Sequence, residues 1–176
     1  MTGATAQAPE AVSPDGAWLA YTALDQIWIA PLEEQGGRLK AGTPTQFFAS
    51  GFRDLASSFS PDGRWLAYQS NESGRNEVYV RPFPSTSARA GKWQISNSAG
   101  TSPHWSRAGH DLVYRSGDQL MRVSYAVNGD VFEAEKPRVW IASMGGALGW
   151  DLAPDGARVA ATIPEGSAPE PQPEHV

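Results

Sequence analysis

The sequence predicts an all-β fold made of β-propeller blades, each a sheet of four antiparallel strands. A turn motif with one shared apolar pattern recurs four times, about 47 residues apart. Each repeat contains short apolar segments separated by polar turns, a pattern typical of strands rather than helices. The 18 glycines and 14 prolines are spread along the chain, which favours many short elements joined by tight turns.

The repeat is visible in four segments that share an apolar start, a turn and an apolar strand. They are VSPDGAWLAYT from Val12, FSPDGRWLAYQ from Phe59, WSRAGHDLVYR from Trp105 and LAPDGARVAAT from Leu152. A period of this length indicates one supersecondary unit per repeat, with neighbouring units stacked on one another.

The Pro-Asp-Gly turn explains the most regular residues of the repeat. Proline presets φ, aspartate accepts hydrogen bonds from local amides, and glycine tolerates a positive φ. We therefore assign structural turn roles to Asp15, Gly16, Asp62, Gly63, Asp155 and Gly156. A repeated metal site at the aspartates is the alternative, but the turn chemistry accounts for them without a metal.

The remaining strands of each blade follow from short apolar runs rich in aromatic and branched residues. Second strands are expected at 18–21, 65–68, 112–114 and 159–161, third strands at 26–29, 77–80 and 119–123, and fourth strands at 45–48, 92–95 and 138–141. A looser connection containing Gly and Pro is expected between the third and fourth strands. Four antiparallel strands per repeat define a propeller blade.

The domain organisation follows from the same repeat. We expect one propeller arc over residues 1–163, with blades at about 9–48, 54–96 and 101–142 and a partial fourth blade at about 147–163. Residues 164–176 carry four prolines, so they predict a linker or disordered tail that cannot supply two further ladder strands. The chain is thus expected to be about three and a half blades of a larger propeller. Uncovered faces on the first and last blades then predict self-association or marginal stability.

The Ser-Pro-Asp-Gly motif at 13–16 and 60–63, followed by a short apolar strand, resembles the TolB-type, WD-like β-propeller repeat of bacteria. The resemblance covers about residues 9–163. It departs from the family pattern at 106–109, where Ser-Arg-Ala-Gly replaces the motif. The Trp-Asp dipeptide that names the WD repeat is absent from the expected strand end.

The segments FSPDGRWLAYQSNESGRNEVYVRPFP and PHWSRAGHDLVYRSGDQLMRV are also similar to the C-terminal propellers attached to bacterial serine/threonine protein kinases. This resemblance implies a sensory or regulatory segment with a kinase on its N-terminal side. Both resemblances imply an extracytoplasmic or periplasmic location, although the first residues contain no signal-peptide pattern. The sequence contains no kinase Gly-rich loop, His-Arg-Asp triplet or Asp-Phe-Gly triplet.

Composition excludes several classes of partner and cofactor. The formal net charge is −5, and no two basic residues are adjacent, so no basic stripe is present to neutralise nucleic-acid phosphates. The absence of cysteine excludes disulfides, thiol catalysis and cysteine-ligated metals. No stretch approaches the roughly 18 apolar residues of a membrane-spanning helix. We expect no cofactor.

The candidate binding residues come from the register of the repeat. Ser58, His104 and Asp151 each immediately precede the apolar residue that ends a first strand, so they are expected at equivalent places on strands that line the propeller channel. Contact with a ligand or with channel water are the two interpretations of such positions. Further candidates lie in predicted loops or strand entries, which often carry binding residues. They are Arg53, Asp54 and Arg75.

Motifs for catalysis are absent. There is no Gly-x-Ser-x-Gly elbow, phosphate-binding glycine loop or dinucleotide fingerprint, and the three histidines have no metal-ligand spacing. The predicted function is therefore a non-catalytic module that binds a protein or a small ligand. The alternative is a propeller fragment attached to a catalytic domain, either a kinase or a hydrolase of the prolyl-oligopeptidase type.

Overall fold

A computed structural model describes residues 7–85 and 91–165, and these residues form strands grouped into four antiparallel sheets. Blade 1 contains β1 (Gln7–Val12), β2 (Trp18–Ala23), β3 (Gln26–Gln35), β4 (Arg38–Ala41) and β5 (Thr45–Gln46). Blade 2 contains β6 (Asp54–Phe59), β7 (Trp65–Ser70), β8 (Glu77–Pro82) and β9 (Trp93–Gln94). Blade 3 contains β10 (Thr101–Trp105), β11 (Asp111–Ser116), β12 (Gln119–Asn128), β13 (Val131–Ala134) and β14 (Arg138–Ile141). Blade 4 contains β15 (Gly149–Leu152) and β16 (Val159–Thr162).

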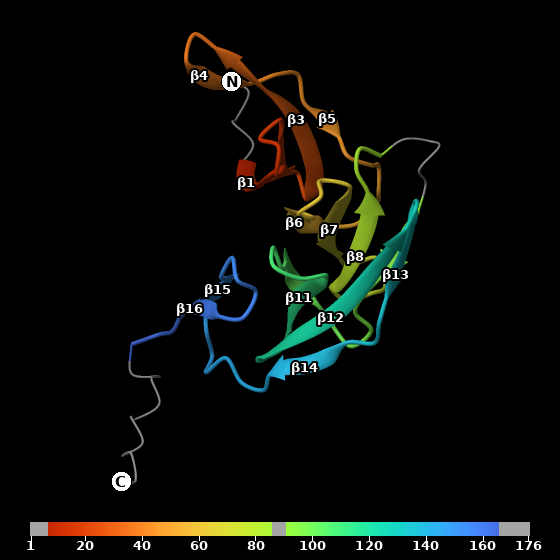
Figure 1. Ribbon diagram of the computed structural model, residues 1–176, viewed down its shortest axis with the longest axis vertical. Helices are drawn as coiled ribbons and strands as arrows, with labels where there is room; N and C mark the ends of the chain where they lie inside the picture. The colour runs from red at the N-terminus through yellow and green to blue at the C-terminus, as the bar shows by residue number, and fades with distance from the viewer. Residues whose placement is uncertain (1–6, 86–90, 166–176) are drawn as a thin grey trace.

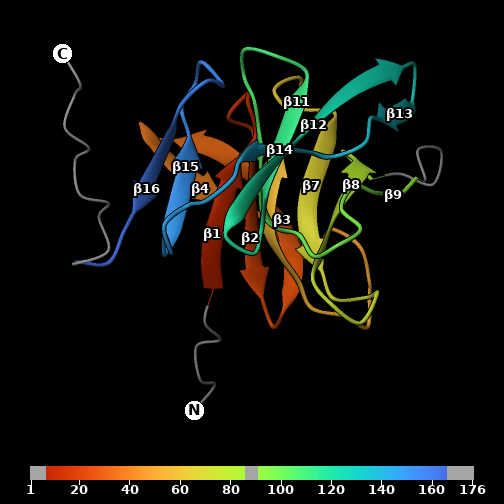
Figure 2. The same cartoon turned by 90° about the horizontal axis from the view of Figure 1, so that it is seen from below.

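The blades follow one another as an open arc. Figure 1 shows blade 1 at the top, blades 2 and 3 below it, and β15 and β16 at the lower left. Figure 2 shows β1 and β15 on one side of the molecule and the outer strands β8 and β9 on the other. Among the described strands, β16 pairs with β15 alone and no pairing joins it to β1. The prediction of an all-β, open propeller arc is confirmed. Most of the expected tail, residues 166–176, lies outside the described residues.

The turn motif forms a compact hydrogen-bonded loop. In blade 1 the Asp15 carboxylate accepts hydrogen bonds from the Ser13 hydroxyl (2.5 Å) and the Ala17 amide (3.0 Å), while Gly16 has a φ of 74°. The bond from Ser13 holds the pKa of Asp15 below its ordinary value, with help from the Ala17 amide. The same network recurs in blade 2 around Asp62 and Gly63. In blade 4, Asp155 accepts a bond from the Ala157 amide, and Gly156 has a φ of 67°.

Blades 1 and 3 depart from the expected four strands, because their sheets contain five. The connection expected to be loose instead folds into a hairpin, β3–β4 in blade 1 and β12–β13 in blade 3. In blade 1 the adjacent Gly36 and Gly37 both have positive φ, 62° and 75°. Two such residues form a tight turn whose twist matches the flanking strands, so Gln35 pairs with Arg38 and the third strand extends to ten residues.

Side chains on successive residues of a strand point to opposite faces, so each blade has one face toward the blade before it and one toward the blade after it. We call these the front face and the back face. The front face of blade 2 packs on the back face of blade 1 in one buried cluster. It contains Phe59, Leu66, Tyr68 and Tyr79 from blade 2 with Ala20, Ile27 and Ile29 from blade 1.

The same arrangement continues along the arc. The cluster between blades 2 and 3 contains Trp65, Ala67, Val78 and Val80 on one side and Trp105, Leu112, Tyr114 and Val123 on the other. The cluster between blades 3 and 4 contains Val113, Leu120, Met144 and Ala147, with Trp150, Leu152 and Val159 packed against it. Blade 2 is therefore the one described blade with complete neighbouring blades on both faces.

The β12–β13 hairpin fastens blade 3 to blade 2. The Phe132 side chain is 2% exposed, and its ring centroid lies 5.3 Å from that of Trp65 and 6.0 Å from that of Trp93. The Arg64 guanidinium of blade 2 donates a 2.6 Å hydrogen bond to the carbonyl of Gly129 in the hairpin turn. A hairpin from one blade thus covers the outer part of the preceding blade.

We predict that Phe132→Ala destabilises the fold by about 3–5 kcal/mol, because it leaves a cavity among the indoles of blades 2 and 3. Leu39→Ala, at the corresponding place in the β3–β4 hairpin, is the matched control. Leu39 is 72% exposed, so its truncation should change the free energy of unfolding by less than about 0.5 kcal/mol. Urea unfolding monitored by tryptophan fluorescence measures both values. Equal effects of the two substitutions would show that the β12–β13 hairpin does not fasten the blades.

Candidate functional site

The innermost strand of each complete blade carries a β-bulge with one extra residue. The irregularities lie between Pro9 and Ala11 in β1, between Leu55 and Ser58 in β6, and between Thr101 and His104 in β10. A bulge bends its strand and redirects side chains, and bulges are frequent beside functional sites. In this chain they occur at the same position in three successive blades.

The bulged backbone is held by the preceding blade. Ala56 and Ser102 have positive φ values of 53° and 50°, which are strained for residues other than glycine. The Ala56 amide donates to the Glu10 carboxylate at 2.7 Å, and the Ser102 amide donates to the side-chain oxygen of Gln69 at 3.1 Å. Contacts between blades therefore stabilise the strained geometry of the inner strands.

Glu10 is the centre of this contact between blades 1 and 2. Its carboxylate also accepts hydrogen bonds from the Ser57 amide (2.7 Å), the Ser57 hydroxyl (2.5 Å) and the Thr22 hydroxyl. Glu10 is not among the residues predicted from the sequence, because the repeat has no carboxylate at this position in its other copies. The available signal was an acidic residue at a strand position that Ser57, Pro103 and Trp150 hold in the other copies.

The inner strands of all four blades surround a groove of about 970 Å³. Polar and charged side chains contribute to its lining from β1, β6, β10 and β15 and from the turn after β10. Among them are Glu10, Ser57, Ser58, Ser102, His104, Arg107 and Asp151. Residues from the innermost strands of all four repeats therefore line one groove.

The structure brings Ser58, His104 and Asp151 to this groove. They pair with Ala67, Val113 and Ala160, which are the corresponding residues of the second strands. The three residues therefore share one register on neighbouring innermost strands.

The His104 imidazole lies against the last blade. Its Nδ1 is 3.4 Å from a carboxylate oxygen of Asp151, and its ring centroid lies 4.4 Å from that of Trp150. Burial lowers the pKa of His104 below its ordinary value, and the nearby Asp151 carboxylate opposes this shift. A largely neutral imidazole at pH 7 offers one donor and one acceptor to a bound group.

Arg107 lines the groove from the turn of blade 3, where it replaces the proline of the turn motif. Its side chain is exposed, and no ion pair among the described residues includes it. It also borders a smaller hollow of about 400 Å³ that is lined by His110 and Tyr125. Arg107 therefore supplies a guanidinium that is available to an acidic group of a ligand.

The two candidates at the start of blade 2 lie outside the groove lining. Asp54 is 1% exposed at the start of β6, where the Ser50 hydroxyl donates to its carboxylate. Burial raises the pKa of Asp54, although hydrogen bonds from Ser50 and Ser70 act in the opposite direction. Arg53 is exposed, and its Nε lies 3.0 Å from the Asp25 carboxylate of blade 1. Both residues contribute to the joint between blades 1 and 2.

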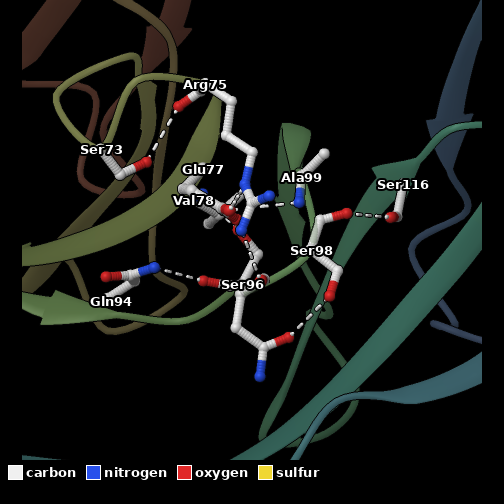
Figure 3. Close-up of polar contacts among 10 residues, drawn as sticks. Ser73, Arg75, Glu77, Val78, Gln94, Ser96, Ser98, Ala99 and Ser116 are labelled. Atoms are coloured by element: carbon white, nitrogen blue, oxygen red, sulfur yellow. Dashed lines mark hydrogen bonds and ion pairs between the residues drawn. The ribbon is translucent and has the colours of Figure 1, made fainter.

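Arg75 also lies outside the groove, in a polar cluster shown in Figure 3. Its guanidinium donates to the buried Glu77 carboxylate at 2.7 Å and to the Asn97 carbonyl at 3.0 Å. Burial by itself would raise the pKa of Glu77, but hydrogen bonds from Ser96, Arg75 and the Ala99 amide lower it overall. This cluster anchors the connection between β9 and β10.

The described residues contain neither a cluster of metal-ligating side chains nor a membrane-spanning helix. Within 7–85 and 91–165, no group of three or more His, Asp or Glu side chains is placed to hold a metal ion. Within the same ranges, no helix has the length and apolar character needed to cross a membrane.

Comparison with known proteins identifies relatives of the fold. No protein-family model and no curated protein matches this sequence. The fold is similar to TolB from Acinetobacter baumannii, with a TM-score of 0.58 and 20% identity over 92% of this chain. It is also similar to a putative TolB from Agrobacterium tumefaciens, with a TM-score of 0.52 and 19% identity over 91% of this chain. The chain spans 39% and 50% of those two proteins, and the likeness shows a TolB-like propeller fold.

We predict that His104 titrates below pH 6.5 in the folded protein and that Asp151→Asn lowers its midpoint further. NMR titration of the imidazole resonances in both proteins measures these values. Because the pKa is lower in the folded state than in the unfolded chain, stability from this group is present above pH 6.5 and is lost as the pH falls. A wild-type midpoint above 6.5, or a higher midpoint in the variant, would contradict the geometry described for this pair.

Proposed function

We propose that this chain is a non-catalytic binding module that holds a polypeptide segment or a small ligand in the groove of its inner strands. The observation that supports this proposal is the convergence of four innermost strands on one groove, with Ser58, His104 and Asp151 in a shared register. Concave sites with a few convergent polar groups are the usual form of ligand sites in folded domains.

The chemistry of the groove suits a ligand with mixed polar groups. Ser58 offers a hydroxyl, His104 offers an imidazole, and the Asp151 side chain is 79% exposed. Arg107 adds a guanidinium whose five donors suit a carboxylate or phosphate. The Glu10 carboxylate already accepts hydrogen bonds from the neighbouring blade. The charged groups of the lining that would meet a ligand are therefore the carboxylate of Asp151 and the guanidinium of Arg107.

We further propose that the module is a sensory or regulatory segment of a larger protein, acting outside the cytoplasm. Its resemblance to kinase-attached propellers supports this assignment, and attachment to a prolyl-oligopeptidase-type hydrolase is the second candidate. The surrounding reading frame separates the two. Kinase motifs followed by a membrane span ahead of the arc support the first, and a Ser-Asp-His hydrolase domain after it supports the second.

The binding proposal is tested with a variant that fills the groove. Phage-displayed random peptides are selected on the wild-type chain and then measured on Ser58→Trp, whose indole would occupy the groove. We expect the affinity of selected peptides to fall at least about tenfold, which corresponds to roughly 1.4 kcal/mol. Thr45→Trp, on the exposed outer strand β5, is the control and should bind them as the wild type does.

Two results would contradict this assignment. Selected peptides that bind Ser58→Trp and the wild type equally would place recognition elsewhere on the chain. A selection that yields no peptide would contradict the polypeptide part of the assignment and leave a small ligand as the occupant.

A further inference from the structure

The front face of blade 1 carries the residues that pack one blade on another elsewhere in the arc. The corresponding positions are Val12, Leu19 and Tyr21 in blade 1, Phe59, Leu66 and Tyr68 in blade 2, and Trp105, Leu112 and Tyr114 in blade 3. In blades 2 and 3 these side chains lie within the buried clusters between blades. In blade 1, Leu19 and Tyr21 belong to a small cluster made of β2 and β3 alone.

The last apolar residue of the innermost strand is exposed in blade 1 and buried in blades 2 and 3. Val12 is 54% exposed, whereas its counterparts Phe59 and Trp105 are 7% and 6% exposed. Blade 1 thus has the side-chain pattern of a packed front face, and no described blade covers it.

The β3–β4 hairpin is the counterpart of the hairpin that fastens blade 3 to blade 2. Leu39 pairs with Glu34 one step from the hairpin turn, as Phe132 pairs with Val127. Phe132 is 2% exposed and Leu39 is 72% exposed. In Figure 1 the β12–β13 hairpin runs beside β8, whereas the β3–β4 hairpin projects from the top of the molecule. Blade 1 therefore has the same kind of hairpin, but no described blade packs against it.

We propose that the front face of blade 1, together with the β3–β4 hairpin, is a docking surface for a complete blade of this same repeat. The interface would continue the one between blades 2 and 3, where Phe132 lies against the indoles of Trp65 and Trp93. The docked blade accordingly presents aromatic side chains at those two positions of its back face, and Leu39 lies against them.

A second copy of this chain fits the surface less well. The other uncovered face within the described residues is the back face of blade 4, which has Arg158 at the position that Trp65 holds in blade 2. The described part of blade 4 also has no strand at the places of β8 and β9. Blade 4 of a second copy therefore presents neither of the two indoles, and a complete blade is the occupant that the interface favours.

The absence of cysteine makes a direct test available, because Leu39→Cys introduces a single thiol. A copy of residues 54–95, placed ahead of the full chain, supplies a blade with both tryptophans. We expect the thiol of Leu39→Cys to react with Ellman's reagent on the order of tenfold more slowly in this fusion than in the unfused chain, because docking limits access to local opening. Leu148→Cys is the matched control. Leu148 is 79% exposed at the other end of the arc, so its thiol should react at the same rate in both proteins.

A further variant tests the role of the indole. Replacing the copied tryptophan of β7 with alanine in the fusion should restore much of the reactivity at position 39. The proposal is overturned if the thiol at position 39 reacts equally fast in fused and unfused chains, including the case in which the added blade stays unfolded. It is also overturned if the unfused chain protects this thiol increasingly as protein concentration rises, because the occupant would then be a second copy.

Discussion

Each blade of this arc is an apolar sheet with two faces, and each face needs a neighbouring blade to remove it from water. Burial of apolar surface contributes about 25 cal/mol per Å², so a covered face is the main source of stability for a short-stranded sheet. Blade 2 satisfies this requirement on both sides, and its Trp65, Tyr68, Val78 and Val80 are fully buried. Among the described residues, blades 1 and 4 have a neighbouring blade on one face only. In blade 1, Val12 and Leu39 are exposed as a consequence.

The groove depends on the same stacking. Its walls include the bulged strands β6 and β10, whose strained backbones at Ala56 and Ser102 are held by acceptors from the preceding blade. The indole of Trp105 likewise donates to the Ser58 carbonyl across the interface between blades 2 and 3 (2.9 Å). Binding and stability are thereby linked, because a change that separates two blades also alters the groove between them.

The sequence predicted the features that are local and repeated. The Pro-Asp-Gly turns, the second strands and the shared register of Ser58, His104 and Asp151 follow from side-chain periodicity and turn chemistry within one repeat.

The features it did not predict arise between repeats or in single copies. The sequence predicts a loose connection where Gly36 and Gly37 form a hairpin turn, because glycines alone do not reveal that strands continue on both sides. The contacts of Glu10 depend on groups of the next repeat, including the Ala56 amide, and the burial of Glu77 depends on Ser96, which is 19 residues away, so neither follows from local periodicity. The central claim, that covered faces set the stability of each blade, is tested most directly by amide hydrogen exchange. We expect the slowest exchange in β7 and β8, with much faster exchange in β16, and equal protection of β7 and β16 would contradict this account.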